Sequence, residues 1–219
     1  MSQSERAPYF PETVMQTDLT PPLAAPGFFS KIRSGIFFVM MAVITLVMGI
    51  VFLPAHLFGE RSVRLCIKLW SRIVLFLLWA ICGVSYQIVG RENIPKDAAL
   101  IASNHQSMWE TIAFFDVLEN PVLAFKKELL SLPIYRWWGV GGGGIVIDRA
   151  AGARAIKALN ADATAKIEEG AQVVIFPEGT RAPAGTINRL KPGIAGLYIA
   201  SGAPCTPCLL YTSPSPRDS

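Results

Sequence analysis

The sequence predicts an α/β domain whose largely parallel sheet is flanked by helices and preceded by an N-terminal membrane-embedded helical segment. A charge-free apolar run over residues 35–53 indicates the membrane segment, and short β-type runs that alternate with helical runs after residue 85 indicate the sheet. Hydrophobic residues make up 52% of the 219 residues, and the mean hydropathy is +0.40. A typical soluble domain of this length is less apolar, so part of the apolar surface should face lipid.

The N-terminal part of the chain contains the predicted anchor. Residues 1–30 are polar and proline-rich and lack the basic start and early apolar core of a secretory signal, which predicts a flexible tail. The run 35–53 has about the length of a bilayer-crossing helix. The later apolar run 73–84 is too short to span, so we expect an interfacial helix that completes an anchor over 31–84. Basic residues flank the first run on both sides, which leaves its orientation open, and a pair of buried core helices is the alternative.

Residues 85–207 are predicted to form the catalytic domain. The strand candidates are short apolar runs, at 86–89, 98–102, 122–125, 145–147 and 173–176. The clearest helix is 153–168, where Ile156, Leu159, Ala163 and Ile167 share one face and Gly170 supplies the stop. Ligands of parallel sheets collect beyond the carboxyl ends of the strands, so the segments that follow the strands are where chemistry is expected.

The first such segment is Asn-His-Gln-Ser-Met-Trp-Glu, directly after the strand candidate 98–102. It places His105 at a strand end with the carboxylate of Glu110 five positions later. A neutral imidazole can take a proton from a hydroxyl, and a carboxylate on its other nitrogen fixes the tautomer. Ser107 and Glu110 also match the S-x-x-E capping box, so the carboxylate has a purely structural alternative at the start of a helix over 108–118.

Cationic residues follow the other strands. Phe-Pro-Glu-Gly-Thr-Arg over 176–181 combines a glycine that permits close backbone approach with Arg181, whose planar fork suits phosphate. Arg149 ends another strand, and two such arginines at one sheet edge favour an anion site. Lys126 and Lys127 follow a further strand, where they would wall an acyl pocket or touch the membrane. The alternative for each segment is a solvated turn.

Several other features indicate no separate function. Residues 141–144 are all glycine but lack the Gly-Lys-Ser/Thr ending of a phosphate loop, so we interpret them as close packing. His56 has no carboxylate nearby and is interpreted as structural. The cysteines lack the spacing of a metal site, and no metal or cofactor is expected. The net charge of +4 arises without the long basic runs of nucleic-acid-binding arms, so no nucleic-acid partner is expected.

From about Gly90 to Pro207 the chain resembles the bacterial lysophospholipid acyltransferases of the 1-acyl-glycerol-3-phosphate acyltransferase type, in motif content and order. Asn-His-Gln-Ser followed by an acidic residue corresponds to the family's His-x4-Asp block, with Glu110 where the family more often has Asp. Residues 126–149 correspond to its second block and Phe-Pro-Glu-Gly-Thr-Arg to its third.

The resemblance implies an O-acyltransferase of phospholipid synthesis that converts lysophosphatidic acid to phosphatidic acid. His105 would be the general base and Glu110 its orienter. The residues implied to shape the site for glycerol phosphate are Arg149, Glu178, Gly179, Thr180 and Arg181. The acyl donor would be acyl-CoA or acyl-ACP. The implied location is the bacterial inner membrane, with the active site on the cytoplasmic side. Two alternatives remain: another acceptor, either glycerol 3-phosphate or a lyso-ornithine lipid, and a non-catalytic membrane-anchored lipid-binding protein.

The C-terminus departs from the family pattern. Ala-Pro-Cys-Thr-Pro over 203–207 looks like the opening of a fourth block, but residues 208–219 resemble a translated sequencing adapter. We therefore expect 208–219 to be a non-native tail and the last strand and helix of the domain to be missing.

Overall fold

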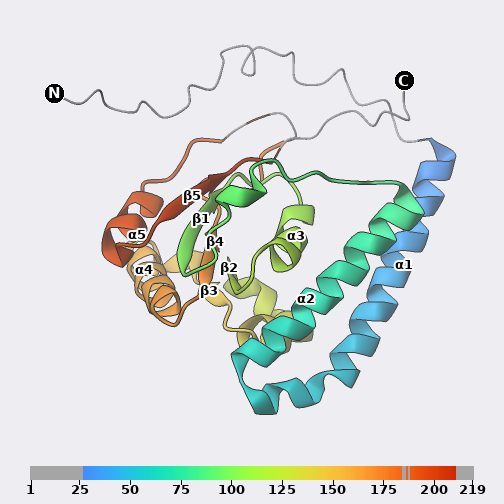
Figure 1. Cartoon of the computed structure of the whole chain (residues 1–219), viewed down its shortest axis with the longest axis horizontal. Helices are drawn as coiled ribbons and strands as arrows, with labels where there is room; N and C mark the ends of the chain where they lie inside the picture. Colours follow the sequence, from blue (N-terminus) through green and yellow to red (C-terminus); the bar gives the residue numbers. More distant parts are fainter. Residues whose placement is uncertain (1–26, 184–185, 187, 211–219) are drawn as a thin grey trace.

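The computed structural model describes residues 27–183, 186 and 188–210. Its centre is a five-stranded sheet in the order β3-β2-β4-β1-β5, in which every neighbouring pair is parallel. The strands are β1 (Ala99–Ser103), β2 (Pro121–Lys126), β3 (Ile145–Ile147), β4 (Gln172–Ile175) and β5 (Cys205–Cys208). The predicted α/β fold with a parallel sheet is confirmed (Figure 1).

One of the strand predictions was wrong, and one strand was not predicted. Residues 86–89 form no strand, because this segment crosses the surface with Val89 89% exposed, while the Tyr86 ring packs edge-on against Trp109. Residues 205–208, for which no strand was predicted, form β5, which pairs with β1 up to the Ser103 and Cys208 partners. Pro204 precedes this strand and Pro207 lies within it, so residue propensities do not predict a strand here. An edge strand nevertheless tolerates proline. Residues 211–219 of the predicted tail lie outside the described residues.

Helices cover both faces of the sheet (Figure 1). Helix α3 (Trp109–Val117) packs on one face, where Phe114 and Leu118 join Ile101 and Val174 in a buried cluster. Helices α4 (Ala153–Glu168) and α5 (Gly193–Ser201) pack on the opposite face. The alternation of side chains along each strand produces these two cores. The bounds predicted for α4 are confirmed, although the side chain of Ile156 is 48% exposed rather than buried.

Six shorter helical turns join these elements: Leu53–Phe58, Leu78–Cys82, Arg91–Asn93, Lys127–Ser131, Tyr135–Gly139 and Arg149–Ala151.

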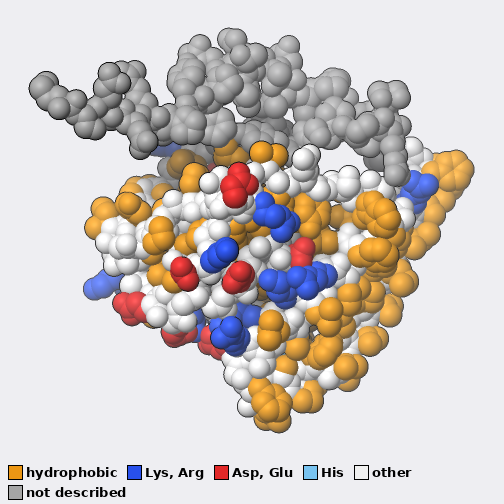
Figure 2. Space-filling model, viewed as in Figure 1, with side chains coloured by type: hydrophobic (Ala, Val, Ile, Leu, Met, Phe, Trp, Pro, Cys, Tyr) orange, Lys and Arg blue, Asp and Glu red, His pale blue; other side chains and the backbone are white. Residues whose placement is uncertain are grey.

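The N-terminal helices form a hairpin beside the domain. Helix α1 (Phe28–Val51) contains residues 35–51 of the predicted anchor run, and Phe37 is its one buried residue. The second apolar run is not a separate short helix, because it belongs to α2 (Glu60–Leu77), which continues as a helical turn to Cys82. Among the described residues these two helices are long and apolar enough to cross a membrane, by length and composition. Figure 2 shows their outer faces as a continuous hydrophobic surface, which fits membrane association.

The basic residues of α2 contact the catalytic domain. Arg64 donates to the Gly142 carbonyl at 2.8 Å, and Lys68 donates to the Leu118 carbonyl at 2.7 Å. Arg72 pairs with Asp116 at 2.7 Å. These side chains therefore hold the hairpin to the domain. Their positions in the sequence are explained by these contacts and not by membrane orientation alone.

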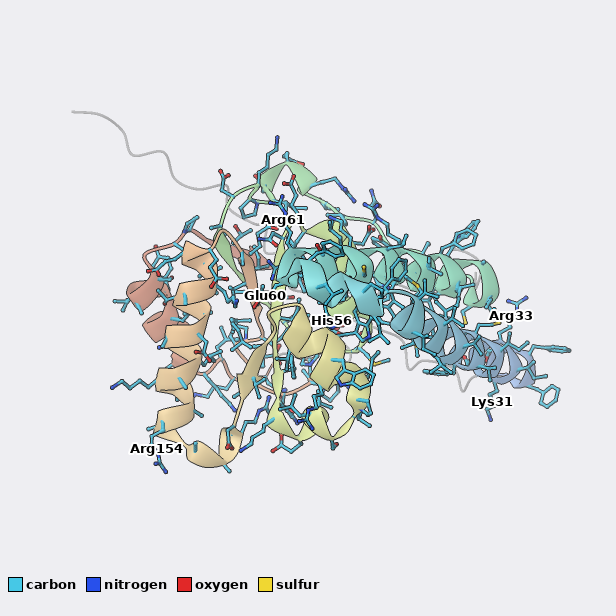
Figure 3. The ribbon with its side chains drawn as sticks, turned by 90° about the horizontal axis from the view of Figure 1, so that it is seen from below. Lys31, Arg33, His56, Glu60, Arg61 and Arg154 are labelled. Carbon is cyan, nitrogen blue, oxygen red and sulfur yellow. The ribbon has the colours of Figure 1, made fainter. Side chains whose placement is uncertain are left out.

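The predicted close packing of the four glycines is confirmed. A methyl group at Gly141 would lie 2.7 Å from Nε2 of His56, and one at Gly143, where φ is +80°, would collide with the Glu60 carboxylate. The His56 ring lies within hydrogen-bonding distance of the Leu53 and Trp137 carbonyls, which agrees with its structural interpretation. Figure 3 shows His56 and Glu60 at the junction between the hairpin and the domain.

Candidate active site

The parallel sheet brings the predicted site residues to one edge. The carboxyl ends of all five strands lie there, because every pair is parallel. The predicted residues follow these ends: His105 and Glu110 after β1, Lys126 and Lys127 at β2, Arg149 after β3, and Glu178, Gly179, Thr180 and Arg181 after β4.

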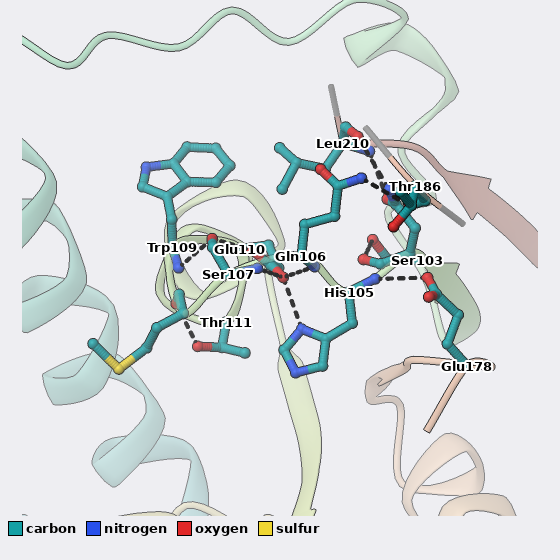
Figure 4. Close-up of polar contacts among 12 residues, drawn as sticks. Ser103, His105, Gln106, Ser107, Trp109, Glu110, Thr111, Glu178, Thr186 and Leu210 are labelled. Atoms are coloured by element: carbon teal, nitrogen blue, oxygen red, sulfur yellow. Dashed lines mark hydrogen bonds and ion pairs between the residues drawn. The ribbon is translucent and has the colours of Figure 1, made fainter. Parts of the chain in front are cut away.

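His105 and Glu110 form a direct pair. Nδ1 of His105 lies 2.7 Å from Oε1 of Glu110, and Figure 4 shows the imidazole turned toward the carboxylate. The Glu110 residue is 2% exposed, whereas the His105 side chain keeps 16% exposure. An ionised carboxylate only accepts, so Nδ1 carries the proton and Nε2 is left with its lone pair. The described residues give Nε2 no hydrogen-bond partner, which leaves it free to take a proton.

Glu110 also caps the loop before α3. Its Oε1 accepts from the backbone N–H groups of Gln106 and Ser107, both at 2.8 Å, and its Oε2 accepts from the Ser107 hydroxyl at 2.5 Å. Ser107 Oγ in turn accepts from the Trp109 N–H at 2.9 Å. The Glu110 carboxylate therefore bonds both the His105 ring and the backbone of the loop before α3, although the helix itself begins at an N-cap, Met108, that makes no side-chain cap bond.

The environment keeps Glu110 ionised. Burial raises the pKa of this carboxyl, but hydrogen bonds from His105, from Ser107 and from backbone N–H groups outweigh it and lower the pKa from 4.5 to about 2. A charge is thus fixed next to the imidazole at neutral pH. The His105 ring is also held by Phe176, which stacks on it with 4.2 Å between ring centroids and 21° between planes.

Glu178 supports the site from behind. It is 1% exposed, and its two carboxylate oxygens accept from the N–H groups of His105 and Asn188, each at 3.0 Å. The Ala182 N–H donates to the His105 carbonyl at 2.7 Å. Because both oxygens are occupied by backbone donors, Glu178 shapes the site by fixing the backbone of His105, and its contact with substrate stays a prediction.

Gly179 lets a lysine approach that sequence reasoning missed. Its φ is +69°, and an added Cβ would lie 2.8 Å from Nζ and 3.1 Å from Cε of Lys191. The Lys191 N–H donates to the Pro177 carbonyl at 2.9 Å, which fixes the segment beside the turn. Lys191 lies in no β-type run or recognised motif, so its distance in sequence from the turn concealed it.

The predicted cations lie at unequal distances from His105. Arg181 is exposed and adjoins Ala182, whose N–H reaches the His105 carbonyl. Arg149 is exposed at the end of β3, three strand steps from β1 and therefore roughly 14 Å away. Lys126 and Lys127 are exposed between them, and Lys127 pairs with Asp148 at 2.8 Å. Thr180 is also exposed.

A second missed residue is Asn104. Its side chain donates to the Leu210 carbonyl at 3.0 Å and accepts from the Leu210 N–H at 2.7 Å. These bonds tie the loop of His105 to the chain that follows β5. Among the described residues no group of His, Cys, Asp or Glu side chains has the arrangement needed to hold a metal ion.

The chain matches a known protein family. The model of the family described as Acyltransferase matches residues 85–211, which is more than half of the chain. The chain belongs to the acyltransferase family. The predicted membership is confirmed, and the protein is an O-acyltransferase.

Named relatives of this acyltransferase point the same way. The 1-acyl-sn-glycerol-3-phosphate acyltransferase of Pseudomonas aeruginosa is 32% identical over 178 residues, which cover 80% of this chain and 69% of the relative. A protein of the same name from Borreliella burgdorferi is 30% identical, over 68% of this chain and 57% of its own length.

The acyltransferase also resembles a solved structure. The 1-acyl-sn-glycerophosphate acyltransferase of Thermotoga maritima matches with a TM-score of 0.65 and 23% identity, over 81% of this chain and 72% of that one. The likeness supports the fold.

Proposed function

We propose that this acyltransferase transfers a fatty acyl group from a thioester donor, acyl-CoA or acyl-ACP, to the free hydroxyl of 1-acyl-glycerol 3-phosphate, giving phosphatidic acid. The observation that carries the proposal is the 2.7 Å pair between His105 and Glu110, which stands at the sheet edge with Nε2 open. Arg181, the neighbour in sequence of Ala182, whose N–H bonds the His105 carbonyl, is the cation that we assign to the phosphate. The choice of acceptor rests on the names of the relatives.

The chemistry follows from the geometry. Nε2 of His105 takes the proton of the acceptor hydroxyl while the oxygen attacks the thioester carbonyl. The tetrahedral intermediate collapses with expulsion of the thiolate, and the imidazolium returns the proton to that sulfur. Glu110 stabilises the imidazolium while it exists, because its charge lies against Nδ1. No covalent enzyme intermediate and no metal or cofactor is part of this proposal.

The predicted basic residues differ in their distance from His105. The hydroxyl and the phosphate of a glycerol phosphate are separated by only a few bonds, so the phosphate must bind close to His105. Arg181 is the better placed of the two arginines, because its neighbour Ala182 bonds the His105 backbone at 2.7 Å. Arg149, roughly 14 Å away along the sheet edge, would reach the phosphate only with its side chain extended inward. Lys126 and Lys127 complete the positive rim.

The membrane helices suit an acceptor that lies in a lipid leaflet. The exposed apolar faces of α1 and α2 lie on the same side of the sheet as α3 (Figures 1 and 2). The His105 ring stacks on Phe176, which packs against the α3 cluster on that side. A hairpin seated in lipid would hold the reacting groups at the interface and remove part of the entropy cost of the encounter. We place the protein at the bacterial inner membrane with the active site on the cytoplasmic side.

The test is acyl transfer by the His105→Ala variant in lipid vesicles. Loss of the general base should lower turnover with lysophosphatidic acid by about 100-fold or more. Flotation with the vesicles should be unchanged, because His105 lies outside the hairpin. Retention of a substantial part of the turnover would contradict the role of His105.

The acceptor is tested with a panel. Wild-type chain should acylate 1-acyl-glycerol 3-phosphate in preference to glycerol 3-phosphate and to a lyso-ornithine lipid. A preference for either of the latter would keep the chemistry and change the acceptor. Binding of lysolipid without any acyl transfer would instead support a non-catalytic lipid-binding protein.

A further inference from the structure

An open hollow lies where the membrane hairpin meets the catalytic domain, outside the candidate active site. Its volume is about 510 Å³. It is lined from α2 and the helical turn that follows it, from the loop at residue 86, from the turn that starts at residue 91 and from α3. Its polar and aromatic lining residues are Arg72, Phe76, Trp79, Tyr86, Arg91 and Asp116. Because the hairpin and the domain both contribute, tertiary packing and not a single surface loop gives the hollow its shape.

Arg72 is oriented in this hollow by Asp116. Its Nε donates to Oδ1 of Asp116 at 2.7 Å, and the Tyr86 hydroxyl donates to Oδ2 of the same carboxylate at 3.2 Å. Both carboxylate oxygens are thereby engaged. Among the described residues the two Nη groups of Arg72 have no hydrogen-bond partner, and the side chain is 60% exposed. One edge of the guanidinium is therefore fixed, while its terminal N–H groups stay available to a ligand.

Arg91 adds a second guanidinium from a different segment. It starts the short turn Arg91–Asn93 directly after Gly90, whose φ of +76° is a left-handed conformation that suits glycine. In the part of the chain that the structure describes, no carboxylate forms an ion pair with Arg91. Asp116 is the one acidic residue that lines the hollow, against two arginines. The lining therefore keeps a positive charge and favours an anion, and guanidinium groups match phosphate in geometry.

Aromatic side chains form the rest of the wall. Phe76 and Trp79 are exposed, with 5.7 Å between their ring centroids, and they extend the exposed apolar surface of α2 to the rim of the hollow. The Tyr86 ring packs edge-on against Trp109 at 5.0 Å, which holds it in place. Tryptophan and tyrosine gather at the headgroup level of a bilayer, and basic pockets beside membrane helices suit anionic headgroups. The hollow thus joins a phosphate-binding pair to an apolar wall that faces the same surroundings as the hairpin.

We infer that this hollow binds the headgroup of an anionic membrane phospholipid other than the substrate, with the phosphate at Arg72 and Arg91 and the hydrocarbon against Phe76 and Trp79. A free phosphate ion would match the arginines but would leave the exposed aromatic wall without a role. A volume of about 510 Å³ falls within the range of small-molecule sites.

The hollow is separate from the catalytic pair. Asp116 lies six residues after Glu110 in α3, which is about 9 Å along the helix axis. It faces Arg72 of α2, whereas the His105 ring stacks on Phe176 after β4. A lipid in the hollow would therefore bind the junction of hairpin and domain without occupying the place of the acceptor hydroxyl.

The experiment is calorimetric titration of dihexanoyl phosphatidylglycerol into the full chain in micelles of an uncharged detergent, with protein-free micelles as the blank. We expect one saturable site. Arg91→Gln and Arg72→Gln should each weaken binding about tenfold, as for loss of one charge-assisted contact. Arg61→Gln is the matched control, because Arg61 is an exposed cation of the same hairpin that does not line the hollow. It should leave the dissociation constant unchanged.

Three further measurements locate the ligand. Dihexanoyl phosphatidylcholine and inorganic phosphate should each bind at least tenfold more weakly than the anionic lipid. His105→Ala should bind that lipid like wild type, because the hollow is separate from the catalytic pair. Thermal melting accompanies Arg72→Gln, since this change also breaks the contact with Asp116. Arg91→Gln decides the test, because it breaks no ion pair among the described residues.

Each opposite result would overturn the inference. Unchanged binding in Arg91→Gln would remove the arginine pair, and an equal loss in Arg61→Gln would show diffuse attraction to the whole basic surface. Loss of binding in His105→Ala would place the lipid in the catalytic centre. Inorganic phosphate that binds as tightly as the lipid would make the hollow a site for the free ion, and equal binding of phosphatidylcholine would show that it does not select anionic headgroups. No acyl transfer is measured, so the inference and the proposed function stand or fall separately.

Discussion

Replacement of Glu110 by glutamine isolates the charge of the catalytic pair. Glutamine keeps the volume of the side chain, and its carbonyl oxygen can still accept from Nδ1 of His105 and from the backbone N–H groups at 106 and 107. Its amide group then faces the hydroxyl of Ser107, which can turn to accept. The fold and the tautomer of His105 should therefore survive, and only the negative charge next to the imidazole is lost.

The size of the effect follows from the electrostatics of the site. The pKa of Glu110 is lowered from 4.5 to about 2, which corresponds to about 3 kcal/mol of stabilisation of its charged form. Burial opposes this shift and hydrogen bonds, that of His105 first among them, produce it. The imidazolium formed during the reaction lies 2.7 Å from that charge. Only the part of this stabilisation that comes from His105 is lost in the transition state, and a charge-assisted hydrogen bond of about 1.5 to 3 kcal/mol lowers kcat by about 10- to 100-fold.

The assay is steady-state acyl transfer to lysophosphatidic acid, with vesicle flotation and thermal melting as controls for membrane binding and folding. A Glu110→Gln kcat within about fivefold of wild type would refute the electrostatic role and leave Glu110 as a helix cap. The pH dependence of folding stability offers a second test of the charge on Glu110. Because the folded pKa is depressed, the ionised carboxylate stabilises the fold fully above pH 4.5 and loses this effect as the pH falls toward 2. The stability difference between wild type and Glu110→Gln should shrink over that window.

Two further substitutions test the support of the site. Glu178→Gln places an amide N–H group against one of the two backbone donors that Glu178 now accepts from. We expect the unfolding free energy to fall by about 2 kcal/mol and kcat to fall as well, as measured by denaturant titration and by turnover. Unchanged stability would show that the buried carboxylate is not needed. Gly143→Ala combines a positive φ with a collision at Glu60 and should lower the melting temperature by several degrees, whereas Gly170→Ala, with φ of +87° and open space, should lower it less. Equal effects would show that only backbone strain matters.

The sequence predicted an element correctly where its local hydrophobic pattern fits only one kind of secondary structure. The helix over 153–168 was predicted to the residue, because its apolar period and its glycine stop agree. The segment 86–89 has the alternation of a strand but no neighbour to pair with, and pairing is a tertiary property that a local pattern does not contain. The strand Cys205–Cys208 has proline inside it and was concealed for the opposite reason, since its place at the sheet edge makes that proline tolerable.

The residues of the candidate site also divide into those that a local pattern predicts and those that depend on tertiary contacts. His105, Glu110 and Arg181 are close in sequence to strand ends, so the rule for parallel sheets found them. Lys191 was missed because it reaches the site only through the Gly179 turn, and Asn104 was missed because its partner is the backbone of Leu210. Contacts made through backbone groups leave no residue-type signal in a sequence.

The basic residues of α2 link the membrane hairpin to the chemistry. Ser71, buried on the same face of α2, donates to the Ile112 carbonyl at 2.6 Å, and Lys68 donates to the Leu118 carbonyl at 2.7 Å. Both acceptors belong to α3 or its C-cap, and α3 carries Glu110 in its first turn. The helix that would rest in the membrane is therefore bonded along the helix that orients the catalytic base. A tilt of the hairpin relative to α3 would break these two bonds, one of which is buried. A hairpin seated in lipid would therefore set the position of α3 and of Glu110 together with its own, and these bonds account for the polar side chains on the inner face of α2.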